Sequence, residues 1–359
     1  MIQKSQKVTM AQIAKEARVS VATVSRAMSP EAVKLNEKTV VRIRKVAESM
    51  GYQVNVAAQT LSRGRAPLIG ILVPQLQTSH YPNLISHASK VLSPAGFEVV
   101  AKEFGQGQGK EVIHALDTMQ RFDASGVIIC PDGHEQQDRY LTQSLYRYHI
   151  PVIIIDRPLN LLGIPNVVPG NYAGGKEGAN WLMENGCDRL LFCQTIRSSV
   201  CPNLWKERYY GFRDAAQQAG VEFSCWQRSA DDVSQKEVLQ LFNWVFSGNK
   251  PGVFLNTLYR MDVLFSILTE VDLNIPKQTL LTGFDWGRLD LRQEKVLRIL
   301  TSLETWPMPI TYSAKDMGEK AADLLLKRLK SDSWETMKID IPITRNVELP
   351  ALSDLHFPE

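Results

Sequence analysis

The chain has 359 residues, of which 44% are hydrophobic and 22% are charged, a balance typical of globular proteins and unlike that of disordered chains. This length is enough for two or three domains with substantial cores. The overall formal charge is +3, but residues 1–65 carry 12 Lys and Arg against four Asp and Glu, a net charge of +8, and the remainder has a net charge of −5. We therefore expect the N-terminal part, and not the body, to face a polyanion.

Several classes of protein are excluded by motifs that the sequence lacks. The five cysteines have no CxxC spacing, the six histidines do not gather at metal-ligand spacing, and G-x-S-x-G and H-E-x-x-H are absent. The GQGQG segment lacks the Lys-Ser/Thr of a phosphate-binding loop. The segment MIQKSQKVTMAQIAKEA lacks the apolar core of a signal peptide, so we expect none, and no apolar run approaches the roughly 18 residues needed to cross a membrane. We predict a cytoplasmic protein that is not an enzyme and uses no metal, cofactor or membrane.

The first fifty residues predict three helices. Thr9 opens a T-x-x-Q capping box at the start of a helix over 10–17. After a short turn, Ser20 caps a second helix over 21–28. Asn36 caps a third helix, whose apolar residues recur at helical spacing until a glycine stops it.

From Leu68 onward, short apolar runs alternate with helical patterns. The runs are LIGILVP, FEVVAKEF, GVIIC, PVIIID, RLLFC, GVFLN and TLLTGF. Strands that are apolar on both faces and alternate with helices predict parallel sheets covered on both sides. Seven such units are too many for one small sheet, so we expect two α/β subdomains with a site at the carboxyl ends of the strands.

The N-terminal helices describe a helix-turn-helix, because a tight turn joins the first two and small residues begin the second. The segment TMAQIAKEARVSVATVSRAM, followed by NEKT, GY and NVAAQTLSRGR, resembles the lactose-repressor/galactose-repressor family of bacterial transcription regulators. The resemblance continues into the α/β body, so it covers nearly the whole chain. It implies a helix-turn-helix domain (1–54), a hinge helix and linker (55–65) and a periplasmic-binding-protein-like effector-binding and dimerisation core (66–359). The core would divide into an N-subdomain (66–169 and 302–331) and a C-subdomain (170–301 and 332–351).

The resemblance also implies how the second helix reads DNA. Val21 and Ala22 stand where the family places residues that contact bases, and their methyl groups suit the methyl of thymine. Arg26, one turn further on, is the candidate for a guanine contact. Ser20 and Thr23 are placed for phosphates, which set the register without reading sequence.

The family's hinge helix would span Asn55–Ser62. Leu61 would be the apolar wedge that enters the minor groove and kinks the duplex, although a buried interdomain role for Leu61 stays open. A helix this short is not stable alone, so we expect it to form only beside its dimer mate on DNA. Together with the helix caps, the expected DNA-binding residues are Thr9, Ser20, Val21, Ala22, Thr23, Arg26, Asn36, Asn55, Ala58 and Leu61.

The turn between the first two helices departs from the family pattern. Arg18 stands where many relatives have glycine. If the backbone there requires a positive φ, an arginine costs up to about 1–2 kcal/mol of strain. In exchange, it offers a cation to a DNA phosphate.

For the body, the resemblance implies an effector site. Tyr81, in an aromatic pair with the preceding histidine, would be a platform for a sugar ring, and Arg208 would clamp a hydroxyl, carboxylate or phosphate. A purely structural salt bridge between Arg208 and Asp285 is the alternative. The expected effector-binding residues are His80, Tyr81, Asp132, Arg208, Asn256 and Asp285.

These features predict a transcriptional repressor that binds a near-palindromic double-stranded operator as a homodimer or a dimer of dimers. A sugar, sugar phosphate or sugar acid bound between the subdomains would control it, by induction or by co-repression. The competing hypothesis is a sugar-binding receptor or sugar-acting enzyme that carries an appended DNA-binding module.

Overall fold

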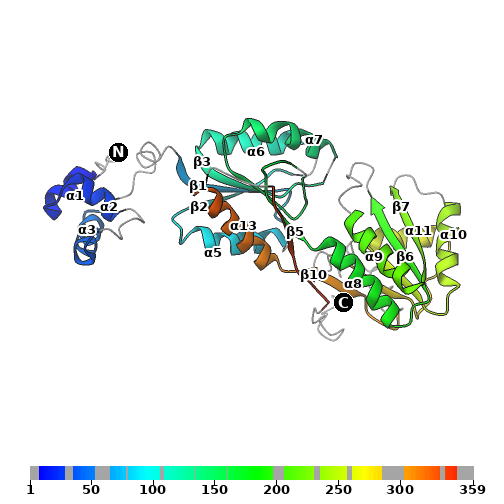
Figure 1. Ribbon diagram of the computed structural model, residues 1–359. Coiled ribbons are helices and arrows are strands. Elements are labelled where there is room, and N and C mark those ends of the chain that lie inside the picture. Colours follow the sequence, from blue (N-terminus) through cyan, green and yellow to red (C-terminus); the bar gives the residue numbers. More distant parts are fainter. Residues whose placement is uncertain are drawn as a thin grey trace, which may run out of the picture.

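The protein consists of an N-terminal helical domain followed by two α/β subdomains (Figure 1). The computed structural model describes residues 8–28, 35–52, 65–77, 80–105, 109–133, 135–159, 161–196, 206–229, 235–256, 261–284, 303–331 and 336–345. Within these ranges, no helix has the length and apolar character required to cross a bilayer.

The N-terminal domain contains the three predicted helices, α1 (Met10–Ala17), α2 (Val21–Ala27) and α3 (Glu37–Ser49). Each begins at the predicted cap, because the side chains of Thr9, Ser20 and Asn36 accept hydrogen bonds from backbone N–H groups of the first turn. The apolar faces of the helices form one small core. Its buried residues are Ile13, Ala14, Ala17, Val24, Ala27, Val40, Ile43 and Ala47.

The first α/β subdomain is built on a six-stranded parallel sheet in the order β11-β5-β4-β3-β1-β2. Its strands are β1 (Ala66–Val73), β2 (Glu98–Glu103), β3 (Ala124–Ile129), β4 (Val152–Ile155), β5 (Asn166–Pro169) and β11 (Lys338–Ile341). Helices α5 (His80–Leu92) and α13 (Ala314–Arg328) cover one face. The other face carries α6 (Lys110–Arg121) and α7 (Glu135–Ser144), followed by the short helix η2 (Leu145–Arg147).

The second subdomain repeats this architecture with a sheet in the order β12-β10-β9-β8-β6-β7. Its strands are β6 (Arg189–Ile196), β7 (Glu222–Ser229), β8 (Pro251–Leu255), β9 (Leu280–Phe284), β10 (Met308–Tyr312) and β12 (Ile343–Thr344). All pairs are parallel except β10 with β12. Helices α8 (Asn171–Glu184) and α9 (Lys206–Ala219) pack on one face, and α10 (Gln235–Phe246) and α11 (Met261–Glu270) on the other.

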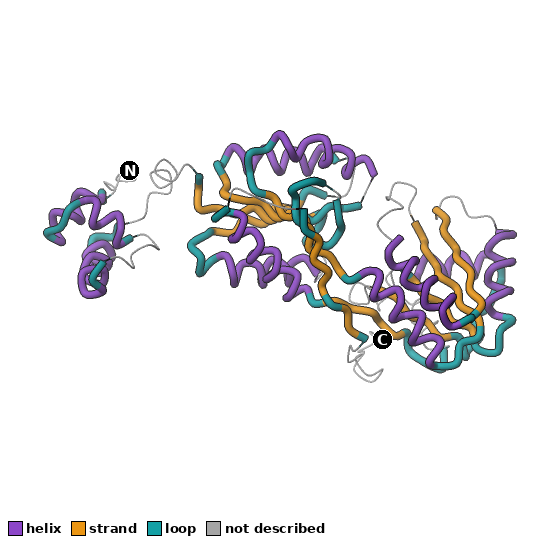
Figure 2. Tube along the Cα trace, in the orientation of Figure 1, coloured by secondary structure: helices purple, strands orange, loops and turns teal. Residues whose placement is uncertain are grey.

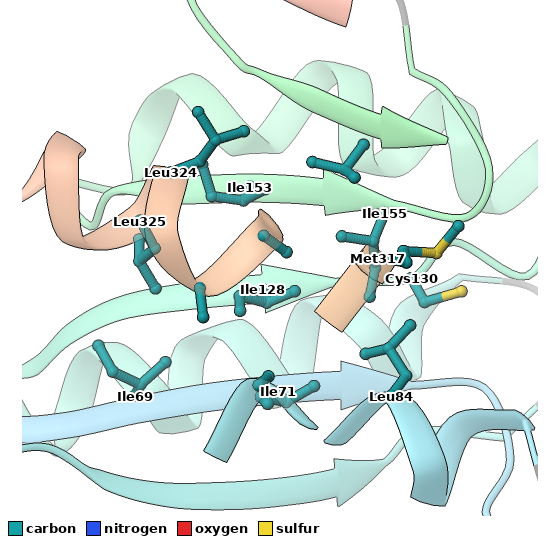
Figure 3. Packing of buried hydrophobic residues seen from close by; sticks show 14 of the residues in the cluster. Ile69, Ile71, Leu84, Ile128, Cys130, Ile153, Ile155, Met317, Leu324 and Leu325 are labelled. Atoms are coloured by element: carbon teal, nitrogen blue, oxygen red, sulfur yellow. The ribbon is translucent and has the colours of Figure 1, made fainter. Parts of the chain in front are cut away.

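The seven predicted strands are all present, and most are buried on both faces as expected. In the first sheet, isoleucine side chains of β1, β3 and β4 pack against leucines of α5 and α13 (Figure 3). Strand β2 is different, because it lies at the edge of the sheet and is largely exposed. The prediction that FEVVAKEF is apolar on both faces is therefore wrong, and its charged residues Glu98, Lys102 and Glu103 are typical of an edge strand.

The chain passes between the two subdomains three times. It crosses from β5 to α8 at Gly170, from β10 to α13 at Ser313, and from β11 to β12 at Pro342. This path corrects the expected subdomain boundaries, since β10 belongs to the second sheet and β11 to the first. Both strands are short and follow no pattern that specifies which sheet they join.

The crossings also fix how the sheets are presented to each other. Strands β5 and β11 of the first sheet lead into the second subdomain from their carboxyl ends, and β10 of the second sheet leads into the first subdomain from its carboxyl end. The carboxyl ends of these strands therefore lie at the junction, where Figure 2 shows strand segments leading from one subdomain into the other. Ligands of open parallel sheets bind at such ends.

Helices α8 and α9 approach each other at glycines. A Cβ atom added at Gly175 would lie 1.8 Å from the backbone oxygen of Arg208, and one at Gly211 would lie 1.9 Å from the backbone oxygen of Tyr172. No real side chain fits at such distances. The glycines therefore bring the two helix backbones close together, and this close contact positions Arg208.

We predict that Gly175→Ala lowers the free energy of unfolding by about 1–3 kcal/mol, because the added methyl forces the two helices apart. Helix propensity alone would raise it by up to about 1 kcal/mol. Urea unfolding measures the difference, with the exposed Gln217→Ala on α9 as the control. A stabilised Gly175→Ala variant would contradict the close approach.

Candidate functional site

The second helix of the N-terminal domain presents a small, partly apolar surface. Val24 and Ala27 are fully buried, which turns Val21, Ala22 and Arg26 to the solvent. Val21 is 48% exposed, a high value for a valine. The predicted base-reading residues thus share one face of α2, and the helix spacing forces this arrangement.

The start of α2 is fixed by Ser20. Its hydroxyl accepts the backbone N–H of Thr23 at 3.1 Å and lies 2.8 Å from the Thr23 hydroxyl. The two hydroxyls that we expect at phosphates are therefore neighbours at one end of the helix. Thr9 forms the predicted capping box with Gln12 at the start of α1, and Asn36 accepts the backbone N–H of Lys38 at the start of α3.

Two residues at this surface were missed by the sequence analysis. Ser25 is exposed and falls between Val21 and Arg26 on the outer face of α2, so helical spacing alone could have identified it. Arg44 of α3 donates its Nε–H to the backbone oxygen of Ala27 at 3.2 Å. This bond holds the C-terminal end of α2, and no local pattern in the sequence predicts it.

Arg18 occupies the left-handed conformation that the sequence analysis considered for this turn. Its φ is 52° and its ψ is 48°, and its backbone N–H donates to the carbonyl of Lys15. This conformation favours glycine. The exposed arginine side chain therefore accompanies a strained backbone in the turn that precedes α2.

In the body, Arg208 is the centre of the first group of effector-site candidates. Its side chain lies on the first turn of α9 and is 4% exposed. Its Nε donates to Oδ1 of Asn171 at 2.8 Å, one terminal nitrogen donates to the backbone oxygen of Asn256 at 2.7 Å, and its guanidinium carbon lies 3.6 Å from the ring centre of Phe284. These contacts hold the planar fork in one orientation at the carboxyl ends of β8 and β9.

Asn256 supplies a second polar group beside this arginine. It is 3% exposed and directly follows β8. Among the described residues, no hydrogen-bond partner contacts its buried side-chain Oδ1. Since an unpaired buried acceptor is costly, it marks a place where a ligand hydroxyl or amide could donate.

The second group of candidates lies on the first subdomain. His80, at the start of α5, has Nε2 3.6 Å from Oδ1 of Asp156, and Tyr312 donates its hydroxyl to the same oxygen at 2.7 Å. The rings of His80 and Tyr312 meet edge to face, with their centres 5.6 Å apart. Tyr312 ends β10 of the second sheet, so this cluster joins the two subdomains.

Tyr81 is a buried residue in this structure. Its ring is 1% exposed and packs in the core of the first subdomain, so the expected sugar platform is a core residue here. The face of α5 that carries Tyr81 also carries Leu84 and Ala88, both fully buried, and the helix period places Tyr81 with them. His80 is the more exposed member of the pair.

The remaining candidates are placed as follows. Asp132 is 5% exposed beyond the carboxyl end of β3, and its backbone N–H donates to Gln137 at 2.7 Å. Asp285, which directly follows Phe284 in the chain, lies outside the described residues. Asn55, Ala58 and Leu61 of the expected hinge helix also lie outside them. The structure therefore brings Arg208 and Asn256 together in one subdomain and places His80 and Asp132 in the other.

Four further residues of this region were missed, and three of them stand at sequence features that could have identified them. Asn171 begins a helical pattern, Asp156 ends an apolar run and Phe284 stands within the G-F-D segment that supplied Asp285. Tyr312 carried no signal, because its partner lies 156 positions away in the chain.

Three of the four described cysteines have the character of core residues. Cys130, Cys187 and Cys193 are buried, and burial raises the pKa of the Cys187 thiol to about 12 and that of Cys193 well above its ordinary value. Thiols with raised pKa values are poor nucleophiles. In the described ranges, no three His, Cys, Asp or Glu side chains are grouped as metal ligands.

Comparisons with known proteins identify the family. Residues 9–55 match the family model described as bacterial regulatory proteins of the lacI family, and residues 66–256 match that of periplasmic binding proteins and the sugar-binding domain of the LacI family. The chain belongs to the LacI family. It is a DNA-binding transcription regulator whose body has the fold of a sugar-binding domain.

Relatives match this chain over nearly its whole length. The ribose operon repressor of Bacillus subtilis is 26% identical over 94% of this chain and 96% of its own, and the sucrose operon repressor of Streptococcus mutans is 26% identical over 91% and 93%. Among solved structures, a lac repressor dimer bound to operator and the anti-inducer ONPF has a TM-score of 0.65 at 17% identity, covering 94% of this chain and 98% of its own. A complex of the regulator CelR with cellobiose has a TM-score of 0.57 at 19% identity and covers 95% and 99%.

The geometry at position 18 predicts that one substitution raises the stability of the domain and lowers its affinity for DNA. Arg18→Gly should stabilise the N-terminal domain by about 1 kcal/mol, because glycine adopts the left-handed conformation without strain. The same change should weaken binding to a duplex of arbitrary sequence and lower the salt slope by about one, as loss of a phosphate contact does.

Hydrogen exchange of α1 and α2 measures the first effect, and a salt titration of duplex binding measures the second. Arg18→Ala is the matched control, because it removes the charge but keeps a Cβ on the strained backbone. Equal stability of Arg18→Gly and Arg18→Ala would refute the backbone strain at position 18. A salt slope that is unchanged in both variants would refute the phosphate contact.

Proposed function

We propose that this regulator is a repressor that binds a near-palindromic operator as a homodimer and is controlled by a sugar or sugar derivative. Its relatives over nearly the whole chain are named as repressors of ribose and sucrose operons, and related structures hold cellobiose or D-xylulofuranose. In this proposal the effector binds between the subdomains and biases their relative arrangement.

The observation that carries the proposal is the oriented cation at Arg208. Asn171, the Asn256 carbonyl and the Phe284 ring hold its guanidinium in a single orientation, at the end of the second sheet that faces the first. A planar fork of donors binds pairs of oxygens, whether vicinal hydroxyls, a carboxylate or a phosphate. Together with the Asn256 acceptor, which has no partner among the described residues, it matches the mixed donors and acceptors of a sugar or sugar acid.

On the DNA side, the proposal assigns base reading to the exposed tip of α2. Small side chains at Val21 and Ala22 allow the helix to approach base edges, and Arg26 reaches a guanine further along the groove. Leu61 of the expected hinge helix would enter the minor groove. Two such half-sites, related by the symmetry of a dimer, require a near-palindromic operator.

Two experiments test the proposal. Selection of duplexes from a random pool by the purified protein should enrich an inverted repeat. A thermal-shift screen with ribose, sucrose, cellobiose, gluconate and phosphorylated hexoses should raise the melting temperature with at least one class, because a ligand that binds only the native state stabilises it. A failure to enrich any repeat would refute the operator, and chemical turnover of a bound sugar would favour the enzyme alternative.

The clamp assignment yields its own prediction. Arg208→Ala should abolish the response of duplex binding to the sugar identified in the screen and leave duplex binding without sugar within about twofold. The reason is that the arginine contacts the ligand and not the DNA. Gel-shift titrations with and without the sugar measure both.

Arg213→Ala is the matched control, because this arginine lies on the same helix but forms an ion pair with Asp214, with an N–O distance of 2.6 Å. This pair lies away from the junction. Arg208→Lys keeps the charge and loses the planar fork, so it should respond only at higher sugar concentration. A full response in Arg208→Ala would refute the clamp.

The hinge assignment predicts the complementary pattern. Leu61→Ala should weaken binding to the selected repeat at least tenfold, since the wedge contributes contacts only when the duplex is kinked. Its affinity for the sugar, measured by calorimetry without DNA, should stay unchanged. Equal loss of both affinities would instead show that Leu61 supports the fold.

A further inference from the structure

A second polar contact joins the two subdomains near the clamp, and it uses residues that the function above does not need. Lys338 of β11 donates to both carboxylate oxygens of Glu207 on α9, with Nζ–O distances of 2.6 and 2.9 Å. An oxygen of a second carboxylate, that of Asp340 on the same strand as Lys338, lies 3.4 Å from the ammonium. One cation therefore bridges a carboxylate of the second subdomain and one of the first.

The positions of these residues follow from the edge of the first sheet. β11 is the outermost strand, and its Ile339 and Ile341 pack against the core that α5 and α13 cover. Because side chains alternate along a strand, Lys338 and Asp340 point to the opposite face. The start of α9 lies within reach of this face, and the three charged side chains meet there partly exposed.

The contact is adjacent to the clamp in the chain. Glu207 directly precedes Arg208 in the first turn of α9. The two side chains leave the helix about 100° apart, so that one reaches the first sheet and the other the clamp residues of the second subdomain. A carboxylate in the first turn is also favoured by the helix dipole. A shift of α9 therefore moves both contacts.

We propose that Lys338, Glu207 and Asp340 form an electrostatic lock that favours the arrangement of the two subdomains seen here. A ligand that engages Arg208 would either strengthen or oppose the preference for this arrangement. A partner surface that binds one arrangement better would do the same. Its role in control of operator binding rests on the function proposed above. Its effect on the subdomain arrangement does not.

The charge pattern predicts an asymmetry between the two partners. Glu207→Gln removes the attraction but leaves Lys338 paired with Asp340. Lys338→Met instead leaves Glu207 and Asp340 facing each other, so that attraction becomes repulsion. Partly exposed ion pairs change a two-state ratio by up to about fivefold, and salt reduces this effect. We therefore expect a larger shift from Lys338→Met than from Glu207→Gln.

The chain contains a matched control. Arg345, which follows β12 of the second sheet, also lies between two carboxylates, those of Glu177 and Glu184 on α8. All three belong to the second subdomain. Arg345→Met therefore removes a cation between two carboxylates without touching the junction.

The experiment measures the distance between the subdomains in the full-length protein without ligand. Spin labels are introduced as non-canonical residues at Phe122, which is 62% exposed beyond α6, and at the exposed Gln218 near the end of α9. Electron-electron resonance then gives the distance distribution for each variant at low and at high salt.

We expect Lys338→Met to change the ratio of the distance populations by up to about fivefold at low salt, Glu207→Gln to change it less, and Arg345→Met to leave it as in the wild type. The charge swap Glu207→Lys with Lys338→Glu should restore much of the wild-type distribution. The same distribution in all variants, or no restoration by the swap, would overturn the lock.

The link to operator control is tested on the duplex selected as described above. Its affinity should shift in Lys338→Met and not in Arg345→Met. If the distances change but the affinities do not, the lock stands and its regulatory role is refuted. If the wild type selects no duplex, the proposed operator function fails while the distance measurement still decides the lock.

Discussion

The three crossings of the chain between the two sheets are the constraint on which the rest of the molecule depends. Each crossing is short, and the first and third are joined by a hydrogen bond from the Gly170 N–H to the Ile341 carbonyl at 2.9 Å. They orient both parallel sheets with their carboxyl ends toward the junction. A ligand bound there contacts both subdomains at once, so binding energy can be converted into a change of angle about the crossings.

The polar groups at the junction are held by regular elements and not by loops. The close backbone contact at Gly175 and Gly211 fixes α9 against α8, and α8 begins directly at the first crossing. Asn171 and Arg208, on these two helices, therefore keep their hydrogen bond in a fixed frame. Tyr312 performs a similar role at the second crossing, where it binds Asp156 and packs against the cores of both subdomains. Such support keeps a binding group oriented before its ligand arrives.

The sequence predicts those features that depend on local periodicity, and it fails where distant segments meet. The helix caps follow from short segments and were predicted, and the departure at Arg18 raised the question of a positive φ, which the structure shows. The sheet to which β10 and β11 belong, the burial of Tyr81 and the bonds of Arg208 to Asn171 and of Asp156 to Tyr312 depend on contacts between segments far apart in the chain. Motif resemblance selected Arg208 and Asn256 as candidates, and the structure brings them together, but the motif could not indicate what orients them, since no spacing rule relates those partners.

A regulator must keep its two arrangements within a few kcal/mol of each other, because a ligand shifts an equilibrium only by its differential affinity. Each subdomain itself must stay rigid while the arrangement changes, and its buried core provides this rigidity. At the junction, by contrast, the structure places partly exposed polar contacts such as that of Glu207 with Lys338. Contacts of this size favour one arrangement without making it irreversible. The division between rigid subdomains and a weakly bonded junction is therefore the physical property that allows a small ligand to control DNA binding at a distance.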